Sequence, residues 1–192
     1  MSNDVNVELV GNDAERAAIY RLRYAVYIEE LGWTSRYANH AQKTLTDNLD
    51  ASGNLFVAFR DNQPVGTLRT HHSADADLGE YISLYHLHDS LRLKPKSIAI
   101  ATMFVVRKSM RLSRIACQLM LAALKKALDE GIDLVFIECE PKMAPFYKKL
   151  GFAIHVPSIL HPDYGPALCL SMAVNNCPLL AKLNLQSLQA AA

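Results

Sequence analysis

The sequence predicts a single α/β domain in which a mixed central sheet carries helices on both faces. Short apolar or alternating runs typical of β-strands are interspersed with runs of helical periodicity, which is the pattern of a layered α/β structure. The length of 192 residues suits one domain with a complete core. No internal repeat, linker or low-complexity block divides the chain. We therefore expect one domain over residues 1–177 and a tail over residues 178–192.

The first predicted elements are a strand over residues 5–10, where polar and apolar side chains alternate, and a helix over residues 14–31. Asn12 and Asp13 offer an N-cap, because their side chains can accept hydrogen bonds from the first backbone N–H groups of the helix. Gly32 is expected to end the helix, since glycine readily takes the positive φ found there. Side chains four positions apart then share one helix face.

The next part of the chain is predicted to form a loop, a hairpin and a partly helical segment. Residues 35–52 are polar and lack clear periodicity, so we expect a loop with room for one helical turn. Residues 54–60 and 65–71 are strands joined by Asp-Asn-Gln-Pro at positions 61–64, residue types that favour a hairpin turn. Residues 76–91 are expected to be helical in part.

The second half of the chain contains a strongly apolar segment, residues 97–106, which predicts the buried central strand. A helix over residues 112–130 follows and is closed by Gly131. The remaining predicted elements are a strand over residues 132–139, a short helix over residues 143–150 and a strand over residues 167–174. The tail is expected to be a docked helix whose apolar face carries Leu179, Leu180, Leu183 and Leu188.

Composition excludes several classes of protein. The chain has 20 Lys and Arg against 19 Asp and Glu, so no overall positive field favours nucleic acid. The start of the chain is polar, unlike a signal peptide, and no apolar run approaches the length of a membrane span. We expect a cytoplasmic protein whose cysteines are reduced, because they lie mostly in apolar runs without a Cys-x-x-Cys pair. These cysteines are Cys117, Cys139, Cys169 and Cys177.

The segment after the central strand has the features of a phosphate site. Arg111 and Arg114 lie in the loop that follows Val106, and a helix is expected to be under way by Ala116. A helix N-terminus presents unpaired N–H groups and the positive end of the helix dipole. Arginine can in addition bind two phosphate oxygens at once. These residues predict a phosphorylated ligand at the start of the helix.

Two motifs give the chain a resemblance to the GNAT superfamily of N-acetyltransferases: Arg-x-x-Arg-x-Ala at 111–116 and Phe-Tyr-Lys-Lys-Leu-Gly-Phe at 146–152. In that superfamily the loop amides bind the pyrophosphate of coenzyme A or the phosphopantetheine phosphate of a carrier protein, and the tyrosine often protonates the departing thiolate. The resemblance implies Tyr147 as this acid and an acyl thioester as co-substrate. Arg114 stands where the common acetyltransferases have glycine, which disfavours plain acetyl-CoA. The implied donor-binding residues are Phe104, Val105, Val106, Arg111, Leu112, Ser113, Arg114, Ile115 and Ala116.

A second pattern, in the first half of the chain, consists of Arg23, Tyr27, Trp33, Asp47, Asp50 and Arg69. It resembles the acyl-homoserine-lactone synthases and the related long-chain N-acyl amino acid synthases, which carry Arg-x₃-Phe-x₅-Trp, Asp-x-x-Asp and Gly-x-x-Arg on the same fold. In the lactone synthases such residues order a loop and the acceptor site. The resemblance implies catalytic roles for Asp47 and Arg69. It implies a substrate site formed by Arg23, Tyr27, Trp33, Asp50 and Thr102, in which Arg23 holds either an acceptor carboxylate or a loop acid.

The chain departs from the lactone synthases on its central strand. Those enzymes have Glu-x-x-Arg-Phe there, whereas residues 100–104 are Ile-Ala-Thr-Met-Phe and contain no ionisable group. We therefore do not predict lactone synthesis for this chain, and the sequence does not assign the general base of the reaction. His71 is one candidate, because its ordinary pKa lies near the working pH. Glu29 and Glu30 are others.

These observations predict an N-acyltransferase that moves an acyl group, expected to be long-chain, from a carrier-protein or coenzyme A thioester to an amine such as an amino acid. The pantetheine arm is expected in a splay between the strand ending at Val106 and the strand over residues 132–139. Alternatives are a short-chain acetyl-CoA-dependent N-acetyltransferase and a non-catalytic acyl-thioester-binding domain. No metal is expected, because the histidine pairs His71–His72 and His86–His88 have no third ligand at a suitable spacing. The residues expected to line an acyl tunnel are Phe56, Val57, Ile98, Ile100 and Met103. The residues of the basic surface, either a dock for an acidic carrier protein or a solvated face, are Arg107, Lys108, Arg111, Arg114, Lys125 and Lys126.

Overall fold

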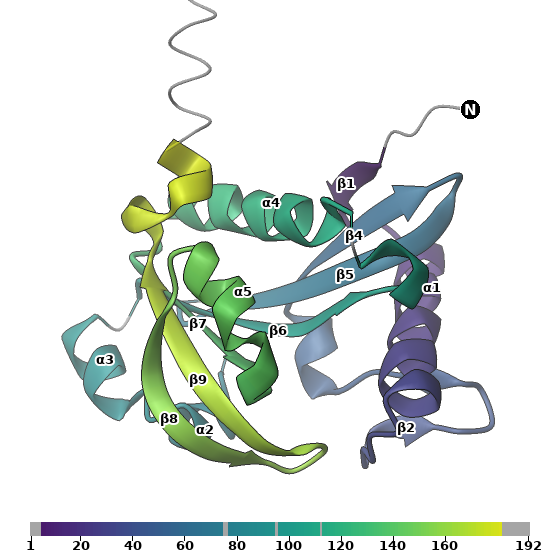
Figure 1. Cartoon of the computed structure of the whole chain (residues 1–192), viewed down its shortest axis with the longest axis horizontal. Coiled ribbons are helices and arrows are strands. Elements are labelled where there is room, and N and C mark those ends of the chain that lie inside the picture. Colours follow the sequence, from purple (N-terminus) through teal and green to yellow (C-terminus); the bar gives the residue numbers. More distant parts are fainter. Residues whose placement is uncertain (1–4, 75–76, 95, 112, 182–192) are drawn as a thin grey trace, which may run out of the picture. The chain divides into compact units, whose positions relative to one another are not determined.

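The computed structural model describes residues 5–74, 77–94, 96–111 and 113–181, and its elements are drawn in Figure 1. Among these residues, seven strands form one sheet in the order β1-β4-β5-β6-β7-β9-β8. Helix α4 lies between β6 and β7 in the chain, a connection of the kind that parallel neighbours require. The antiparallel pairs are β1–β4, β4–β5, β7–β9 and β8–β9. The predicted α/β class with a mixed sheet is confirmed.

The chain divides into two compact units. The first is drawn from Met1–His71, Ala101–Ala123 and Pro162–Tyr164, and the second from His72–Ile100, Leu124–His161 and Gly165–Ala192. Strand β6 and helix α4 each contribute residues to both units. The splay predicted between β6 and β7 stays a prediction.

The first unit begins with β1 (Asn6–Leu9) and helix α1 (Asp13–Arg23). The predicted N-cap is confirmed, because the Asn12 side chain accepts from the Glu15 N–H at 3.0 Å. The predicted single helix to residue 31 is wrong in detail: α1 passes at Tyr24–Glu30 into a π-helix, and Gly32 follows it with φ of 70°.

The predicted loop over residues 35–52 contains two short strands that the sequence did not indicate, β2 (Ala38–Asn39) and β3 (Thr44–Leu45). The expected helical turn is a 3₁₀-helix, Asn48–Ala51. Strands of two residues carry almost no periodic signal, which explains why the pair was missed.

The predicted hairpin consists of β4 (Asn54–Arg60) and β5 (Gln63–His72), which run side by side in Figure 1. The turn between them is tighter than expected, because Asp61 and Asn62 both have positive φ and form a two-residue connection. Helix α1 packs on β4 through Ile19, which lies in one apolar cluster with residues of that strand.

The central strand β6 (Ile98–Val106) matches its prediction, and the helix after it, α4, covers Ile115–Asp129 instead of starting at residue 112. The β5 strand approaches this region closely. A Cβ placed on Gly66 would lie 2.9 Å from a Leu119 methyl group and 3.2 Å from the Val105 carbonyl oxygen. Only glycine therefore fits at this contact between β5, β6 and the start of α4.

The second unit contains helices α2 (Tyr81–Leu84), α3 (His88–Leu93) and α5 (Ala144–Lys149), and strands β7 (Leu134–Cys139), β8 (Ala153–His161) and β9 (Gly165–Ala173). Figure 1 shows β8 and β9 as a long hairpin. The β8 strand was not predicted. Among the strands of the described residues it pairs with β9 alone, has two register irregularities and is exposed along most of its length, so it lacks the alternation of a half-buried strand.

Residues 178–181 of the predicted tail are helical, and residues 182–192, with Leu183 and Leu188, lie outside the described residues. All four cysteines fall within the described part and are free thiols. Burial raises the pKa of the Cys139 thiol to about 12. Every helix in the described part is too short or too polar to cross a bilayer.

Candidate active site

The candidate site is built on a short acidic turn in the first unit. Asp47 precedes the 3₁₀-helix Asn48–Ala51, and its side chain accepts a hydrogen bond from the Leu49 N–H at 2.9 Å. The Asp50 side chain reaches back to accept from the Asp47 N–H at 3.0 Å, which completes a capping box. Thr46 donates its hydroxyl to the same Asp50 oxygen at 3.0 Å. The turn therefore holds two carboxylates in fixed directions.

Two buried arginines bind these carboxylates. Arg69 of β5 forms a bidentate pair with Asp47, in which Nη2 lies 2.9 Å from Oδ2. Its Nη1 lies 3.0 Å from Oδ1 of Asp50, and Arg23 at the end of α1 places Nη1 2.7 Å from that same oxygen. The Arg69 Nε donates to the Thr102 hydroxyl on β6 at 3.0 Å. We call Arg23, Asp47, Asp50, Arg69 and Thr102 the acid–arginine cluster.

The electrostatics of the cluster keep Asp50 ionised. Both arginines are fully buried, and a buried cation requires a partner of opposite charge. Burial alone would raise the pKa of Asp50. The charges of Arg23 and Arg69, with hydrogen bonds from Arg23 and the Asp47 backbone, more than offset this and lower it to about 2. Asp50 is therefore a carboxylate throughout the neutral range and cannot exchange protons there.

The structure thus brings together five of the residues that the sequence predicted for the site. Arg23 binds a loop acid, which is one of the two roles left open for it. Its Nε and Nη2 are buried without a hydrogen-bond partner among the described residues, and its guanidinium lies over the Tyr20 ring at 5.6 Å from the centroid.

His71, one of the candidate bases, lies beneath the acidic turn. Its Nε2 is 2.6 Å from the Leu49 carbonyl oxygen, and because a carbonyl only accepts, this nitrogen carries the proton. Burial, and then the charge of Arg69, lower the pKa of His71, so the ring is neutral at neutral pH. A Cβ on Gly53 would lie only 2.7 Å from Nε2. His71 therefore stabilises the acidic turn through its hydrogen bond to the Leu49 carbonyl.

A stack of three aromatic rings lies in the same unit. Trp33 is parallel to Tyr27, with ring centroids 4.3 Å apart, and on its other side to Tyr164 at 4.2 Å. The Tyr27 hydroxyl donates to the Phe104 carbonyl oxygen of β6 at 3.3 Å. The sequence predicted that Tyr27 and Trp33 belong to the substrate site, but it did not point to Tyr164. The tip of the β8–β9 hairpin brings Tyr164 in from far along the chain, and no local pattern reports such a contact.

The central strand is irregular at the point where the stack reaches it. Met103 has φ of 52°, the left-handed region that side chains other than glycine and asparagine rarely adopt. Such strain costs about 1–3 kcal/mol and is concentrated at functional sites. Thr102 of the acid–arginine cluster lies on one side of Met103, and Phe104, which accepts from Tyr27, lies on the other.

Residues of the basic loop after β6 form hydrogen bonds and an ion pair with other residues of the protein. Arg111 donates from Nε to the Val106 carbonyl oxygen at 3.1 Å, and its Nη1 lies 2.6 Å from Glu30. The Ser113 hydroxyl accepts from the Ile115 N–H at 3.3 Å, so Ser113 binds the first backbone N–H group of α4. Arg107, Lys108, Ser113 and Arg114 are exposed, and Leu112 lies outside the described residues.

The candidate bases Glu29 and Glu30 are both engaged in ion pairs. Glu29 lies 2.9 Å from Lys43, and Glu30 binds Arg111 as described. Of the residues expected to line an acyl tunnel, Met103 is half-buried. Four are buried as ordinary core residues are: Phe56, Val57, Ile98 and Ile100. Among the described residues, no group of three His, Cys, Asp or Glu side chains is arranged to hold a metal ion.

Tyr147 lies on α5 in the second unit and is buried. Its ring packs edge-on against Phe146 and Phe152, with centroids 5.2 Å and 5.9 Å away. Gly151 has φ of 101°, and a Cβ there would lie 2.8 Å from Pro178. The Tyr-x-x-x-Gly-Phe pattern therefore has a packing role in this unit, beside the chemical role that the resemblance implies.

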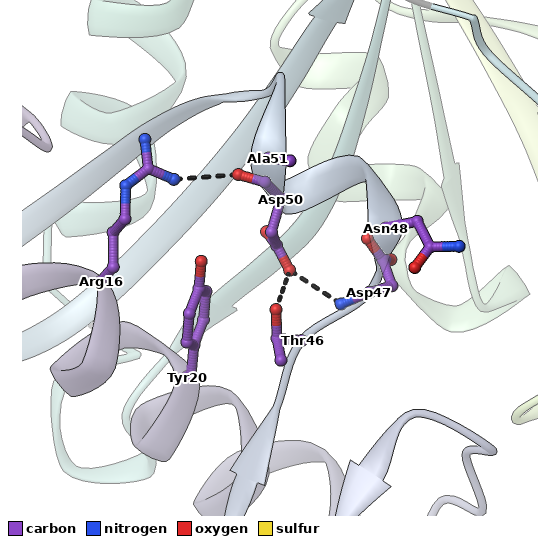
Figure 2. A pocket seen from close by; sticks show the side chains of 7 residues that line it. All are labelled: Arg16, Tyr20, Thr46, Asp47, Asn48, Asp50 and Ala51. Carbon is purple, nitrogen blue, oxygen red and sulfur yellow. Dashed lines mark hydrogen bonds between the residues drawn. The ribbon is translucent and has the colours of Figure 1, made fainter. Parts of the chain in front are cut away.

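An open pocket of about 540 Å³ adjoins the acidic turn. Figure 2 shows Arg16 and Tyr20 of α1 projecting into it opposite the turn, with the Asp50 carboxylate between Thr46 and the Asp47 backbone. Arg16 donates from Nη1 to the Asp50 carbonyl oxygen at 2.9 Å. The lining residues are Arg16, Tyr20, Thr46, Asp47, Asn48, Asp50 and Ala51.

Solved structures share this fold. FeeM, an N-acyl amino acid synthase from uncultured soil microbes, is similar with 21% identity and a TM-score of 0.75 over 92% of this chain and 96% of that chain. The AHL synthase LasI is similar with 17% identity and a TM-score of 0.71, over 91% and 92% of the two chains. An acyl-CoA N-acyltransferase from Pseudomonas aeruginosa is similar with 19% identity and a TM-score of 0.63, over 88% and 99%.

Comparison at the level of sequence families is more specific. No protein of curated function matches the chain. The family described as N-acyl amino acid synthase FeeM matches residues 18–173, a range that contains the acid–arginine cluster, the aromatic stack and the basic loop. The chain therefore belongs to the FeeM family of N-acyl amino acid synthases, which are acyltransferases that act on amines.

Proposed function

We propose that this acyltransferase moves a long acyl chain from a phosphopantetheine thioester to the amine of an amino acid. The observation that carries the proposal is the connection from the acidic turn, through Arg69 and Thr102, to the irregular β6 strand at Met103. A turn that belongs to an acceptor site and a strand that would hold the thioester are thereby parts of one buried network.

In this proposal the acid–arginine cluster orders the acceptor loop and transfers no proton. The low pKa of Asp50 supports this role, since a carboxylate that stays ionised to about pH 2 is a poor base near neutrality. The bidentate binding of Asp47 by Arg69 also supports it, because both Asp47 oxygens are occupied. Pre-ordered loops of this kind contribute to catalysis by positioning the reactants.

Backbone N–H groups of β6 would polarise the thioester carbonyl. The positive φ at Met103 turns the backbone out of the regular ladder, which can release N–H groups near Phe104 from strand pairing. N–H groups aimed at a developing oxyanion are an efficient source of transition-state stabilisation. Trp33 and Tyr27 would form a wall of the acceptor site beside this strand.

The donor would be bound by the start of α4 and the basic loop. N–H groups in the first turn of a helix have no partner within the helix and can bind phosphate; in α4 the Ile115 N–H is bound by Ser113, and Arg114 and Lys108 are exposed in the loop before the helix. This positive surface suits an acidic acyl carrier protein as the source of the thioester, with coenzyme A as the second candidate. Arg114, in place of glycine, supports a donor other than acetyl-CoA. Tyr147 is the residue that the resemblance implies for protonating the thiolate.

Mass spectrometry of lipids tests the proposal directly. Extracts of a bacterial host that expresses the chain should contain new long-chain N-acyl amino acids, which would identify acceptor and chain length together. An Arg111→Ala, Tyr147→Phe double variant should produce none of them. Lys142→Ala, at an exposed side chain of the second unit, is the matched control and should keep the full yield. New short-chain amides in place of lipids would favour the acetyltransferase alternative.

The donor is tested by thiol release in vitro. Acyl carrier protein and acyl-CoA of the same chain length are compared as donors with the unmodified protein, Arg114→Ala and Lys108→Ala. If a carrier protein is the donor, each variant should raise KM for the acyl carrier protein several-fold and leave KM for acyl-CoA nearly unchanged. Equal effects on both donors would exclude the basic loop as a protein dock.

A further inference from the structure

The guanidinium group of Arg23 is hydrogen-bonded at one of its three nitrogens. Its Nη1 lies 2.7 Å from Oδ1 of Asp50, whereas Nε and Nη2 are buried and have no hydrogen-bond partner among the described residues. We call these two nitrogens, whose N–H bonds run parallel on one side of the planar group, the unpaired edge of Arg23. Buried donors of a charged group are costly to leave without an acceptor, and they are rare in folded proteins.

The unpaired edge has the geometry that a carboxylate fits. Two parallel N–H groups of an arginine can donate to both oxygens of one carboxylate, as Arg69 does with Asp47. Oδ1 of Asp50 already accepts from Arg23 and Arg69. Oδ2 of Asp50 accepts from Thr46 and from the Asp47 N–H. A carboxylate for the unpaired edge would therefore come from a ligand.

The pocket beside the acidic turn adjoins Arg23. Tyr20 and Asp50 both line this pocket (Figure 2), and the Arg23 guanidinium carbon lies 5.6 Å from the centroid of the Tyr20 ring. Arg23 therefore contacts two residues of the pocket wall. Tyr20 is half-buried, and its hydroxyl forms no hydrogen bond within the part of the chain that the structure describes. Rotation of this ring would bring the unpaired edge into reach of a ligand in the pocket.

The charges around the pocket favour a ligand with one negative charge. Within the acid–arginine cluster, Arg23 and Arg69 balance Asp47 and Asp50. Arg16 lines the pocket and donates to the Asp50 carbonyl oxygen, and it forms no ion pair with any other described residue. Arg16 thus adds a positive charge that the two carboxylates of the cluster do not neutralise.

We propose that Arg23 binds the carboxylate of the acceptor through its unpaired edge and makes the enzyme selective for amines that carry a free carboxylate. This inference rests on the proposed function and deepens it, because it assigns the residue that recognises the acceptor class. Arg23 would then fill both roles that the sequence left open for it. Nη1 keeps the loop acid Asp50, and the opposite edge binds the acceptor.

The position of Tyr27 fits this arrangement. It lies four residues after Arg23 on the same helix face, about 6 Å farther along at the rise of an α-helix. Its ring stacks on Trp33, and its hydroxyl donates to the Phe104 carbonyl oxygen on β6. An amino acid along this face would have its carboxylate at Arg23 and its ammonium group beside the aromatic rings, which attract cations. The amine would thereby be directed toward β6.

The carboxylate requirement is tested first with the unmodified protein. Thiol release from a long-chain thioester is measured with a mixture of the common L-amino acids and, separately, with the corresponding amino acid amides. The carboxamide has nearly the shape of the carboxylate but no charge. Compared per free amine, the acids should give a kcat/KM at least about tenfold higher, because a hydrogen bond to a charged group is worth about that factor. Equal or faster release with the amides would overturn the inference.

Arg23→Lys tests whether the requirement lies at Arg23. Lysine can keep the ion pair with Asp50 but has no planar edge for a carboxylate. The preference for acids should fall to about twofold or less, while release with the amides should change by less than about threefold. Arg21→Lys, at an exposed side chain of the same helix, is the matched control and should keep the full preference. Equal losses for acids and amides in Arg23→Lys would show that Arg23 only supports the acidic turn.

Arg16→Gln serves if Arg23→Lys does not fold. Glutamine can still donate to the Asp50 carbonyl oxygen but removes the additional positive charge of the pocket. The preference for acids should then fall several-fold with little change for the amides. An unchanged preference would overturn the pocket as the place where the carboxylate binds.

Saturation-transfer NMR without any thioester separates this inference from the function on which it rests. Amino acids that bind the unmodified protein should lose their signals in Arg23→Lys, and the amides should give none. Such binding without thiol release from any amine would overturn the proposed function and support the carboxylate site. Thiol release without a preference for acids, or with a preference that Arg23→Lys leaves intact, would overturn the inference and leave the proposed function in place.

Discussion

Arg69 binds Asp47 through two hydrogen bonds, and the Arg69 side chain is fully buried while that of Asp47 is 8% exposed. This pair fixes the acidic turn to strand β5, and through Thr102 it reaches β6. Two parallel N–H···O bonds depend on the planar guanidinium, which lysine cannot reproduce. The position of the acidic turn therefore depends on the guanidinium geometry of Arg69 as well as on its charge.

Arg69→Lys is expected to destabilise the fold and to reduce activity together. Lysine keeps the charge but leaves at least one Asp47 oxygen and the Thr102 hydroxyl without their donor, and breaking a buried pair costs about 3–5 kcal/mol. We expect a smaller loss for lysine, about 2 kcal/mol, because one contact can persist. Urea unfolding measures the change in the free energy of unfolding. Lys108→Ala, at an exposed side chain, is the control and should stay within about 0.5 kcal/mol.

The stability of the fold should depend on Asp50 at acid pH. Its pKa is lowered from 3.8 to about 2 in the folded protein, so the folded state binds protons less readily than the unfolded chain. The stabilisation is therefore present above the unfolded pKa and lost as pH falls from about 4 through 2. It amounts to about 2 kcal/mol by linkage.

Urea unfolding at several pH values measures this contribution as a difference between two proteins. Asp50→Asn cannot titrate, so the unmodified protein should lose about 2 kcal/mol more than the variant between pH 5 and 2. The variant is expected to be less stable at pH 7, because it leaves Arg23 buried without its partner. Parallel pH curves for the two proteins would show that Asp50 is not bound as the structure has it.

Sequence patterns predicted the four charged members of the acid–arginine cluster because each belongs to a motif with fixed spacing; these are Arg23, Asp47, Asp50 and Arg69. The same patterns could not find Tyr164. This residue lies in the turn of a late hairpin, and β8, the strand before it, is exposed and irregular, so neither periodicity nor a motif marks the turn. The π-helix at Tyr24–Glu30 was also missed, since a shift from α to π geometry leaves the apolar pattern almost unchanged.

The backbone at Met103 gives a prediction about strain. Valine at this position should destabilise the protein by about 1–3 kcal/mol, because a β-branched residue tolerates positive φ poorly. Met103→Gly should cost less than Met103→Val, since relief of the strain offsets the lost packing of a half-buried side chain. Thermal unfolding ranks the two variants. A glycine variant less stable than the valine variant would mean that side-chain packing, and not the backbone, dominates at this position.

The aromatic stack should contribute more to acceptor binding through Tyr164 as a ring than through its hydroxyl. Tyr164→Phe keeps the ring on Trp33 and should change kcat/KM for the acceptor by less than about twofold. Tyr164→Ala removes the stacking contact, worth about 0.5–1.5 kcal/mol beyond area burial, and should lower kcat/KM about tenfold. Thiol release at varied acceptor concentration measures both. A large effect of the phenylalanine variant would point to a polar role for the hydroxyl instead.

Gly53 offers a way to disturb the acidic turn without touching any charged side chain. A Cβ at this position would lie 2.7 Å from Nε2 and 2.8 Å from Cε1 of His71, and 2.9 Å from Cγ of Arg69. Real Cβ atoms do not approach so closely, so in Gly53→Ala the imidazole must move and its hydrogen bond to Leu49 must lengthen or break. The expected cost is about 1–3 kcal/mol of stability, as for other overpacked sites. Activity should fall with it, because the turn that carries Asp47 loses its support. Gly11→Ala is the matched control, since a Cβ there meets nothing within 4 Å, and equal effects of the two substitutions would show that His71 does not hold the turn.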